Sequence, residues 1–265
     1  ARMLRAGQDV REYHLDAELL HEFRMGGSQY PAYYSIVAAG ANACVLHYRA
    51  DAAPVKDGDL VLIDAGCELD GYASDITRTF PANGRFTGPQ LALYELVLAS
   101  QDAAVAATRA GARFNDPHDA TVRVLSQGLL DLGLLDASKV GSVDDVIAQR
   151  AYFPFYMHRT SHWLGMDVHD CGSYVEPTEL NAVSERKDPL SGETIKNRPS
   201  RILQAGMVLT IEPGIYVRPA PGVPEEFHHI GIRIEDDAIV TDGGCELITR
   251  GVPVQADEIE ALMRA

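Results

Sequence analysis

Long apolar runs and closely spaced cysteines are both missing from this chain of 265 residues. No stretch of about 18 or more apolar residues occurs, so we expect no membrane-spanning helix. The four cysteines, Cys44, Cys67, Cys171 and Cys245, are widely spaced and form no CxxC pair. Neither a disulfide framework nor a zinc knuckle is therefore expected. We expect buried free thiols in a reducing compartment, and hence a cytoplasmic protein.

Positive charge is also scarce. The chain has 23 Lys and Arg against 38 Asp and Glu, a formal net charge of −15. Nucleic-acid binding favours a basic patch, but the densest basic stretch, residues 196–201, is short and interrupted. We therefore expect no nucleic-acid partner and no membrane partner. The acidic balance leaves room for a functional excess of carboxylates, which metal sites require.

The first five residues do not have the pattern expected of a signal peptide. Residues 1–5 resemble the last turn of a helix that is already under way, so we expect the sequence to begin inside a longer protein. With 46% hydrophobic residues, the 265 residues are enough for one domain with a large core. The 23 glycines and 14 prolines fit a turn-rich α/β or α+β domain.

Apolar periodicity and turn residues divide the chain into expected elements. Helices are expected over residues 14–25, 87–108, 119–132, 144–150 and 257–263, the last capped by Asp257. β-Structure is expected over residues 36–48, where Gly40 and Asn42 interrupt it, and over residues 60–63, 72–80, 207–211 and 230–240, with a turn at 70–71. Residues 173–200 are polar and aperiodic and contain three prolines, so they are expected to form a long surface loop.

One internal similarity suggests two related halves. Residues 58–66 (GDLVLIDAG) align without gaps on residues 206–214 (GMVLTIEPG). Each segment has a glycine, a short apolar strand, an acid and a second glycine. The pattern predicts that each half delivers one carboxylate, Asp64 or Glu212, from the end of a core strand.

Four acidic residues lie on or beside strongly apolar strands. Asp64 and Glu212 each follow an apolar run, Asp75 begins a strand, and Glu235 shares a strand face with Arg233. Some of these acids could be surface residues at strand ends, and one could pair with Arg233. Burying all four without a cation is unfavourable, because isolated and like charges are costly in an apolar interior. The set therefore indicates a metal site.

Three of the nine histidines, His158, His162 and His169, fall within twelve residues. Such clustering favours ligand or acid–base work over a structural role. A zincin pair is not present, because Arg159 stands where that motif has Glu. A carboxylate-rich site suits manganese or a similar divalent ion, and two such ions can share a water. The residues alone thus indicate a metal hydrolase of unknown substrate.

Five motifs, in order along nearly the whole chain, resemble the methionine aminopeptidase/prolidase superfamily. They place Asp64 in IDAG, Asp75 in SDITRTF, His162 in SHWLG, Glu212 in TIEPG and Glu235 in GIRIED. The resemblance implies the "pita-bread" fold, an α+β architecture with a pseudo-twofold antiparallel sheet flanked by helices. It also implies that these five residues bind two divalent ions, with manganese favoured and zinc, cobalt or iron as alternatives.

Within that superfamily, SDITRTFP and LGMDVHD look like the proline-directed branch, above all aminopeptidase P. The resemblance implies that Asp75 and Glu235 bridge the ions, and that Glu212 takes the proton of the attacking water. His169 would steady the tetrahedral intermediate. Further substrate-binding or supporting residues would be His47, His158, Arg233 and Tyr216. Without the resemblance, His47 would be interpreted as a core histidine.

The resemblance therefore predicts a dinuclear exopeptidase that releases the first residue of short peptides with proline second. A dipeptidase (prolidase) is the main alternative; creatinase-like and methionine aminopeptidase activities fit the motifs less well. A catalytically silent pita-bread binding module is the alternative from another class. Residues 1–265 would be the catalytic domain alone, without the family's N-terminal domain and most of the first helix. A homo-oligomer is expected for the full-length form.

Overall fold

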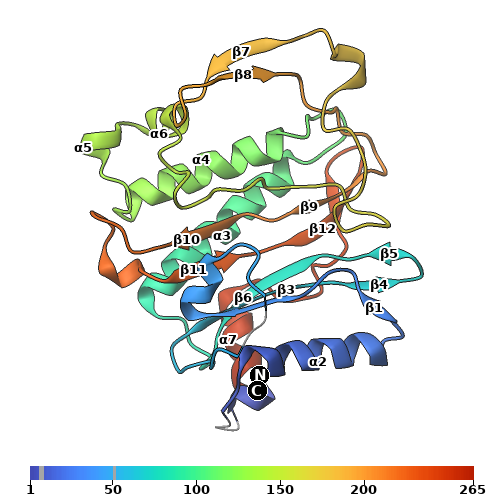
Figure 1. The fold of residues 1–265 in the computed structure, drawn as a ribbon, viewed down its shortest axis with the longest axis vertical. Helices are drawn as coiled ribbons and strands as arrows, with labels where there is room; N and C mark the ends of the chain where they lie inside the picture. Colours follow the sequence, from blue (N-terminus) through green and yellow to red (C-terminus); the bar gives the residue numbers. More distant parts are fainter. Residues whose placement is uncertain (6–8, 50–51) are drawn as a thin grey trace.

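The computed structural model describes residues 1–5, 9–49 and 52–265 and combines helices with antiparallel strands (Figure 1). The helices are α1 Arg2–Arg5, α2 Glu12–Met25, α3 Gly88–Ala107, α4 Asp116–Asp131, α5 Ala137–Val140, α6 Val143–Gln149 and α7 Ala256–Arg264, with 3-10 turns η1 Gly40–Cys44, η2 Pro177–Glu179 and η3 Glu225–Phe227. The strands are β1 Tyr30–Pro31, β2 Ile36–Ala39, β3 Leu60–Ala65, β4 Cys67–Leu69, β5 Tyr72–Ala73, β6 Ile76–Pro81, β7 Ser184–Lys187, β8 Thr194–Asn197, β9 Val208–Ile211, β10 Gly214–Val217, β11 Ile230–Arg233, β12 Asp236–Val240 and β13 Cys245–Leu247. The expected α+β class is confirmed.

Two three-stranded antiparallel sheets form the centre, in the orders β2-β3-β6 and β13-β12-β9. A β-bridge between Thr77 and Glu235 joins them, with the Glu235 amide donating to the Thr77 carbonyl at 3.0 Å. The two similar sequence segments supply β3 and β9, one in each sheet. The two halves expected from the sequence are thus present, and the seam between them runs past Glu235.

Helix α3 packs against strands β9, β10 and β11 and against α4, and the two helices contribute much of the largest core cluster (Figure 1). Leu93 and Tyr94 of α3 and Leu125 of α4 are fully buried there with Ile232 of β11. Helix α3 begins where the sequence predicts, because Thr87 forms a capping box with Gln90. This layer gives the sheets a rigid backing.

Two expected strands are interrupted where they carry acids. The 72–80 segment divides into β5 and β6 on either side of Ser74 and Asp75, and the 230–240 segment divides at Ile234 and Glu235. Close packing forces the first break: a Cβ on Gly66 would lie 1.7 Å from the Ser74 carbonyl oxygen. Both acids therefore project from irregular backbone between strands. The expected 70–71 turn is confirmed, with positive φ at both residues.

The expected surface loop over residues 173–200 is exposed along most of its length, but it is not irregular throughout, because it contains the antiparallel hairpin β7–β8. All four β7 residues are exposed, so the apolar alternation that marks a strand is lacking. The hairpin lies far from the central sheets, above α4 and α6 (Figure 1). The break expected at Gly40 within 36–48 is present, because β2 ends at Ala39 and η1 begins at Gly40, but no strand resumes before Tyr48.

Two smaller expectations also change. The residue preceding α7 is Gln255, so Asp257 lies in the first turn and is not the cap. Cysteines 44, 67, 171 and 245 are all free, as expected, but Cys171 is exposed and only Cys44 is buried. Among the described residues, no helix has the length and apolar character to cross a membrane.

Candidate metal centre

A cavity of about 800 Å³ lies where the two halves meet, and all five expected ligand residues line it. They are Asp64 near the end of β3, Asp75 before β6, His162 in the segment before β9, Glu212 after β9, and Glu235 between β11 and β12. Asp64 lies within β3, whereas the other three acids lie directly beside the ends of strands. Residues from both halves of the sequence therefore meet in one hollow.

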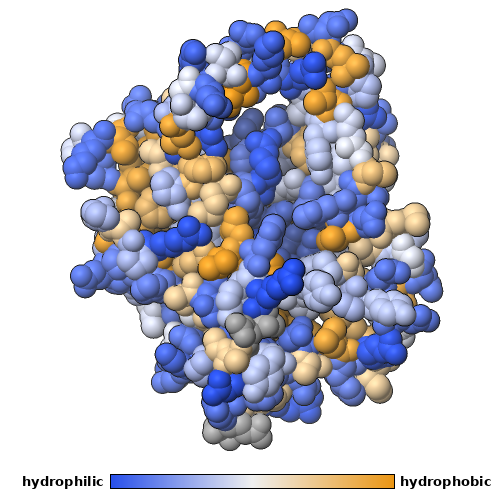
Figure 2. Space-filling model, in the orientation of Figure 1, coloured by the Kyte–Doolittle hydropathy of each residue, from blue (hydrophilic) through white to orange (hydrophobic). Residues whose placement is uncertain are grey.

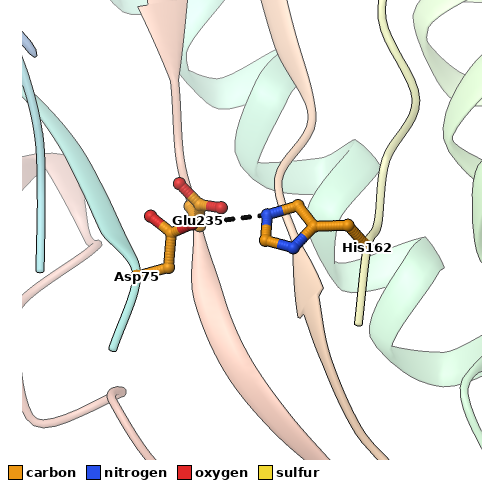
Figure 3. Close-up of side chains that lie close together, drawn as sticks. All are labelled: Asp75, His162 and Glu235. Atoms are coloured by element: carbon orange, nitrogen blue, oxygen red, sulfur yellow. Dashed lines mark ion pairs between the residues drawn. The ribbon is translucent and has the colours of Figure 1, made fainter. Parts of the chain in front are cut away.

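Asp75, His162 and Glu235 form the tightest group. One potential ligand atom from each lies within 4.8 Å of the others, and Figure 3 shows the three side chains pointing toward one another. The His162 Nε2 is 3.3 Å from an Asp75 carboxylate oxygen. The His162 Nδ1 lies 2.9 Å from the Trp163 carbonyl oxygen, which can only accept a hydrogen bond. Nδ1 therefore carries the proton, which leaves Nε2 as the free donor atom for a metal.

Asp64 and Glu212 adjoin this group. Glu212 lies 3.7 Å from the His162 Nε2. The Tyr33 hydroxyl lies 2.5 Å from one oxygen of Asp64 and 2.5 Å from one oxygen of Asp75, linking the two acids. Arg233 donates to the other Asp64 oxygen. The alternative that one acid pairs with Arg233 is thus correct for Asp64, and the remaining acids have no such partner among the described residues.

The electrostatics of the site favour a cation. Burial raises the pKa values of Asp75, Glu212 and Glu235 well above their usual range, and repulsion from neighbouring carboxylates raises them further. A bound divalent ion would remove this repulsion and replace the lost solvation. The oxygen-rich donor set with one imidazole nitrogen fits such ions.

A hydrogen-bonded chain backs one side of the cavity. Arg233 donates to the Tyr216 hydroxyl at 2.9 Å, and that hydroxyl lies 2.9 Å from the His158 Nε2. The His158 Nδ1 contacts the Arg159 carbonyl at 2.8 Å and must be the donor, so Nε2 accepts from Tyr216. Burial lowers the pKa of His158 to about 3, which keeps the ring neutral. Tyr216 itself is fully buried behind the cavity wall.

His47 and His169 both line the cavity. The His169 ring packs edge-on against His162, with ring centroids 4.3 Å apart. Its pKa is lowered by partial burial and by the neighbouring His162, so the neutral imidazole is favoured. His169 is therefore placed beside the donor group and can donate one N–H into the cavity.

Sequence reasoning missed two residues that shape the site. Tyr33 joins two acids, yet nothing in its surroundings marks it among the 11 tyrosines. Glu12 is fully buried and accepts from the Ala39 amide at 2.9 Å and from the Tyr48 hydroxyl at 2.8 Å. It thereby fixes the segment that carries His47. Its position in the first turn of a polar helix gives no sign of burial.

A buried ion pair supports Glu235 from behind. Arg78 donates to Asp236 at 2.7 Å and also to the Glu235 carbonyl oxygen. Gln101 of α3 donates to the other Asp236 oxygen at 3.1 Å. These contacts join β6, β12 and α3, and they hold the irregular backbone from which Glu235 projects.

Comparisons with known proteins agree with this geometry. The curated "Xaa-Pro aminopeptidase" of Escherichia coli (strain K12) is 47% identical over 96% of this chain and 52% of its own length. "Xaa-Pro aminopeptidase 1" of Streptomyces coelicolor is 37% identical over 100% of this chain and 49% of its own length. The chain thus spans about half the length of the curated relatives it matches.

Solved structures match in fold as well. The Pseudomonas aeruginosa aminopeptidase PepP superposes with a TM-score of 0.85 at 54% identity, over 97% of this chain and 53% of that one. These matches confirm the pita-bread α+β fold that the motifs implied. The model of metallopeptidase family M24 matches residues 1–242, which include all five candidate ligands. The chain belongs to metallopeptidase family M24.

Proposed function

We propose that this chain is the catalytic domain of a metal-dependent exopeptidase that removes the residue before proline, an Xaa-Pro aminopeptidase. The observation that carries the proposal is the gathering of five potential ligands from both halves in one cavity. Relatives named Xaa-Pro aminopeptidase support the choice of substrate. The chain covers 52% of the length of the E. coli relative quoted above. The homo-oligomer expected for the full-length form stays a prediction.

The proposed cofactor is a pair of divalent ions. Asp64, Asp75, His162, Glu212 and Glu235 would hold them. When bound, the ions polarise the scissile carbonyl and lower the pKa of the attacking water. Manganese is favoured by ligand type, with zinc, cobalt and iron as alternatives; one matching structure is titled a zinc-substituted E. coli aminopeptidase P in complex with product.

Glu212 is the proposed proton acceptor. Its carboxylate has only imidazoles as charged or chargeable partners within 4 Å in the described chain, His162 at 3.7 Å and His158 at 3.8 Å. Burial, and then Glu235, raise the pKa of Glu212, which brings its proton affinity toward that of an effective general base. Glu212 would take the water proton and pass it to the leaving proline nitrogen.

His169, His158 and His47 are the proposed substrate contacts. His169 would donate its N–H to the oxyanion that develops at the scissile carbonyl. His47 and His158 would line the pocket around the proline ring. Arg233 would act by holding Asp64, and Tyr216 by holding His158 and Arg233, since Tyr216 lies behind the wall.

The test is a cleavage assay combined with metal analysis. Chelated protein reloaded with Mn²⁺ should bind two ions per chain and release the first residue of Arg-Pro-Pro, while chelated protein should not. Cleavage of Gly-Pro but not Arg-Pro-Pro would instead identify a dipeptidase. Two bound ions without hydrolysis of either peptide would contradict the proposal and favour a silent binding module.

A further inference from the structure

A second cavity of about 370 Å³ adjoins the metal centre. It shares His158 and Arg159 with the main cavity, so these two residues form a wall common to both. The rest of its lining comes from α4, from the 147–157 segment and from Arg186 on β7. Figure 2 shows the surface hollowed beneath the β7–β8 hairpin, among hydrophilic side chains. A bound peptide that extends from the metal centre past Arg159 would therefore reach this second cavity.

The second cavity is cationic, although the whole chain carries a net charge of −15. Three guanidinium groups line it, those of Arg150, Arg159 and Arg186, against one carboxylate, Asp119. His118 adds no charge, because burial and the nearby Arg159 lower its pKa to about 3. The lining thus has an excess of positive charge.

The three arginines differ in how far their charge is already neutralised. Arg150 pairs with Asp188 at 2.8 Å. Arg159 donates to the neutral Asn115 amide oxygen. Arg186 has no side-chain hydrogen bond or ion pair within the described chain, and it is exposed at the cavity's edge. Asp119 interacts with Arg159 electrostatically, but neither Arg159 nor Arg186 has a carboxylate within ion-pair distance in the part of the chain that the structure describes.

The hairpin that carries Arg186 is held in place by polar contacts at both ends. At its tip, Asp188 is only 7% exposed, accepts from the Leu190 amide at 2.7 Å and pairs with Arg150. At its base, Arg113 donates to both oxygens of Glu179, at 3.0 and 2.9 Å. A two-stranded hairpin is marginally stable by itself, so these contacts set the position of Arg186 over the cavity.

Arg150 occupies a strained position. It ends α6 in the left-handed conformation, with φ 55°, which favours glycine or asparagine over other residues. Its guanidinium stacks over Phe153 at 4.3 Å while it holds Asp188. Strain of this kind persists where the side chain serves a purpose that outweighs it. Here that purpose is to fasten the hairpin above the second cavity.

We propose that the second cavity is an anion subsite that takes a carboxylate of a peptide whose first residues occupy the metal centre. The carboxylate is either the peptide's C-terminus or an acidic side chain beyond the proline. Arg159 and Arg186 bind it, because guanidinium groups match carboxylates in charge and in two-point geometry. The subsite rests on the proposed peptidase function, and it makes the enzyme selective for acidic tails.

The experiment compares matched peptides on the Mn²⁺-loaded protein. Ala-Pro-(Ala)n peptides of increasing length are used as free acids, as amides, and as amides with Glu in place of the last Ala. Hydrolysis gives kcat/KM, and calorimetry gives affinity without requiring turnover. At the best length we expect the acid to exceed the amide by about fivefold, as for a partly exposed ion pair. Which of the two carboxylate peptides shows the larger excess identifies the source of the carboxylate.

Variants then test the residues. Arg186→Ala should bring the acid-to-amide ratio to about one, and Arg159→Ala should lower it. Lys196→Ala is the matched control, because Lys196 pairs with Glu185 and lies on the other face of the same hairpin, so the ratio should be kept. High salt should shrink the wild-type ratio.

The outcomes separate the two proposals. Hydrolysis at equal rates for acid and amide at every length would overturn the subsite and leave the peptidase function standing. Absence of hydrolysis, with tighter acid binding that Arg186→Ala abolishes, would overturn the peptidase function and support the subsite. An acid preference that Lys196→Ala removes as fully as Arg186→Ala would also overturn the subsite, because it would reflect the general charge of the hairpin.

Discussion

The ends of β3 and β9 have nearly the same sequence pattern but opposite surroundings. Asp64 lies within a ladder, opposite Ile36 and Thr77, and its carboxylate contacts Arg233 and the Tyr33 hydroxyl. Glu212 follows the last residue of β9, and only imidazoles lie within ion-pair distance of it among the described residues. A repeated pattern therefore sets where an acid emerges, whereas the partners supplied by other elements decide its chemistry.

The difference assigns unlike tasks to the two acids. A carboxylate held by a buried guanidinium is fixed in position, which suits a permanent ligand. A carboxylate without such a partner can gain and lose a proton, which suits a base. Three experiments, from the largest expected effect to the smallest, test this contrast.

The largest effect is expected from Glu212→Gln. The amide keeps the size of the side chain but cannot take a proton, so kcat for Xaa-Pro peptides should fall about 10³-fold. Metal content, measured by mass spectrometry, should stay close to that of the wild type. A near-normal kcat with full metal occupancy would show that Glu212 is a ligand only and that another group accepts the proton.

The second test concerns stability of the metal-free protein. Asp64→Asn leaves the buried Arg233 guanidinium without its ionic partner, and should lower the free energy of unfolding by about 3 kcal/mol. Glu212→Gln removes a buried acid that is repelled by Glu235, and should raise that free energy at neutral pH. Tyr33→Phe, which deletes only a hydroxyl, should cost about 1 kcal/mol. Urea unfolding measures all three.

Equal destabilisation by Asp64→Asn and Glu212→Gln would remove the contrast between the two strand ends. It would mean that the site tolerates either loss in the same way, and that Arg233 finds compensation from other carboxylates. If Tyr33→Phe destabilised the protein as much as Asp64→Asn does, the Tyr33 hydroxyl would be the main group that holds Asp64 and Asp75 in place.

The smallest effect concerns how stability depends on pH. The stability of the metal-free protein and the stabilisation that metal adds should change with pH in opposite directions. Asp75, Glu212 and Glu235 have raised pKa values, so above the ordinary carboxyl range, about pH 4, the folded metal-free protein holds more protons than the unfolded chain. Its stability should therefore fall as pH rises through that window. Ions require deprotonated ligands, so the stabilisation added by Mn²⁺ should grow with pH.

Thermal unfolding from pH 5 to 8, with chelator or with Mn²⁺, measures both slopes. Glu212→Gln is the matched control, because it should flatten the metal-free slope by removing one of the three titrating acids. A metal-free stability that is the same for both proteins at every pH would show that Glu212 does not titrate in this range.

The gathering of the four acids in one cavity could be predicted from the sequence, because carboxylates beside apolar strands have few alternatives to a metal. The choice of His162 among the clustered histidines rests on the family resemblance and stays a prediction. Thr87 likewise fixed the start of α3, since a capping box acts locally. Tyr33 and Glu12 could not be predicted, because their partners lie far away along the chain and no local pattern marks them. The hairpin β7–β8 was missed since polar clamps, rather than alternating apolar residues, hold it.

The single β-bridge between Thr77 and Glu235 is the backbone link that the described chain places between its two central sheets. Ions bound by both Asp75 and Glu235 would link these two residues, and would so close a loop that contains the long stretch of chain between them. Loop closure of this kind removes entropy from the unfolded chain, and ligand binding stabilises the folded state by mass action. The bound ions would then hold the two halves together. Loss of metal would therefore weaken the contact between the halves at the same time as it abolishes activity.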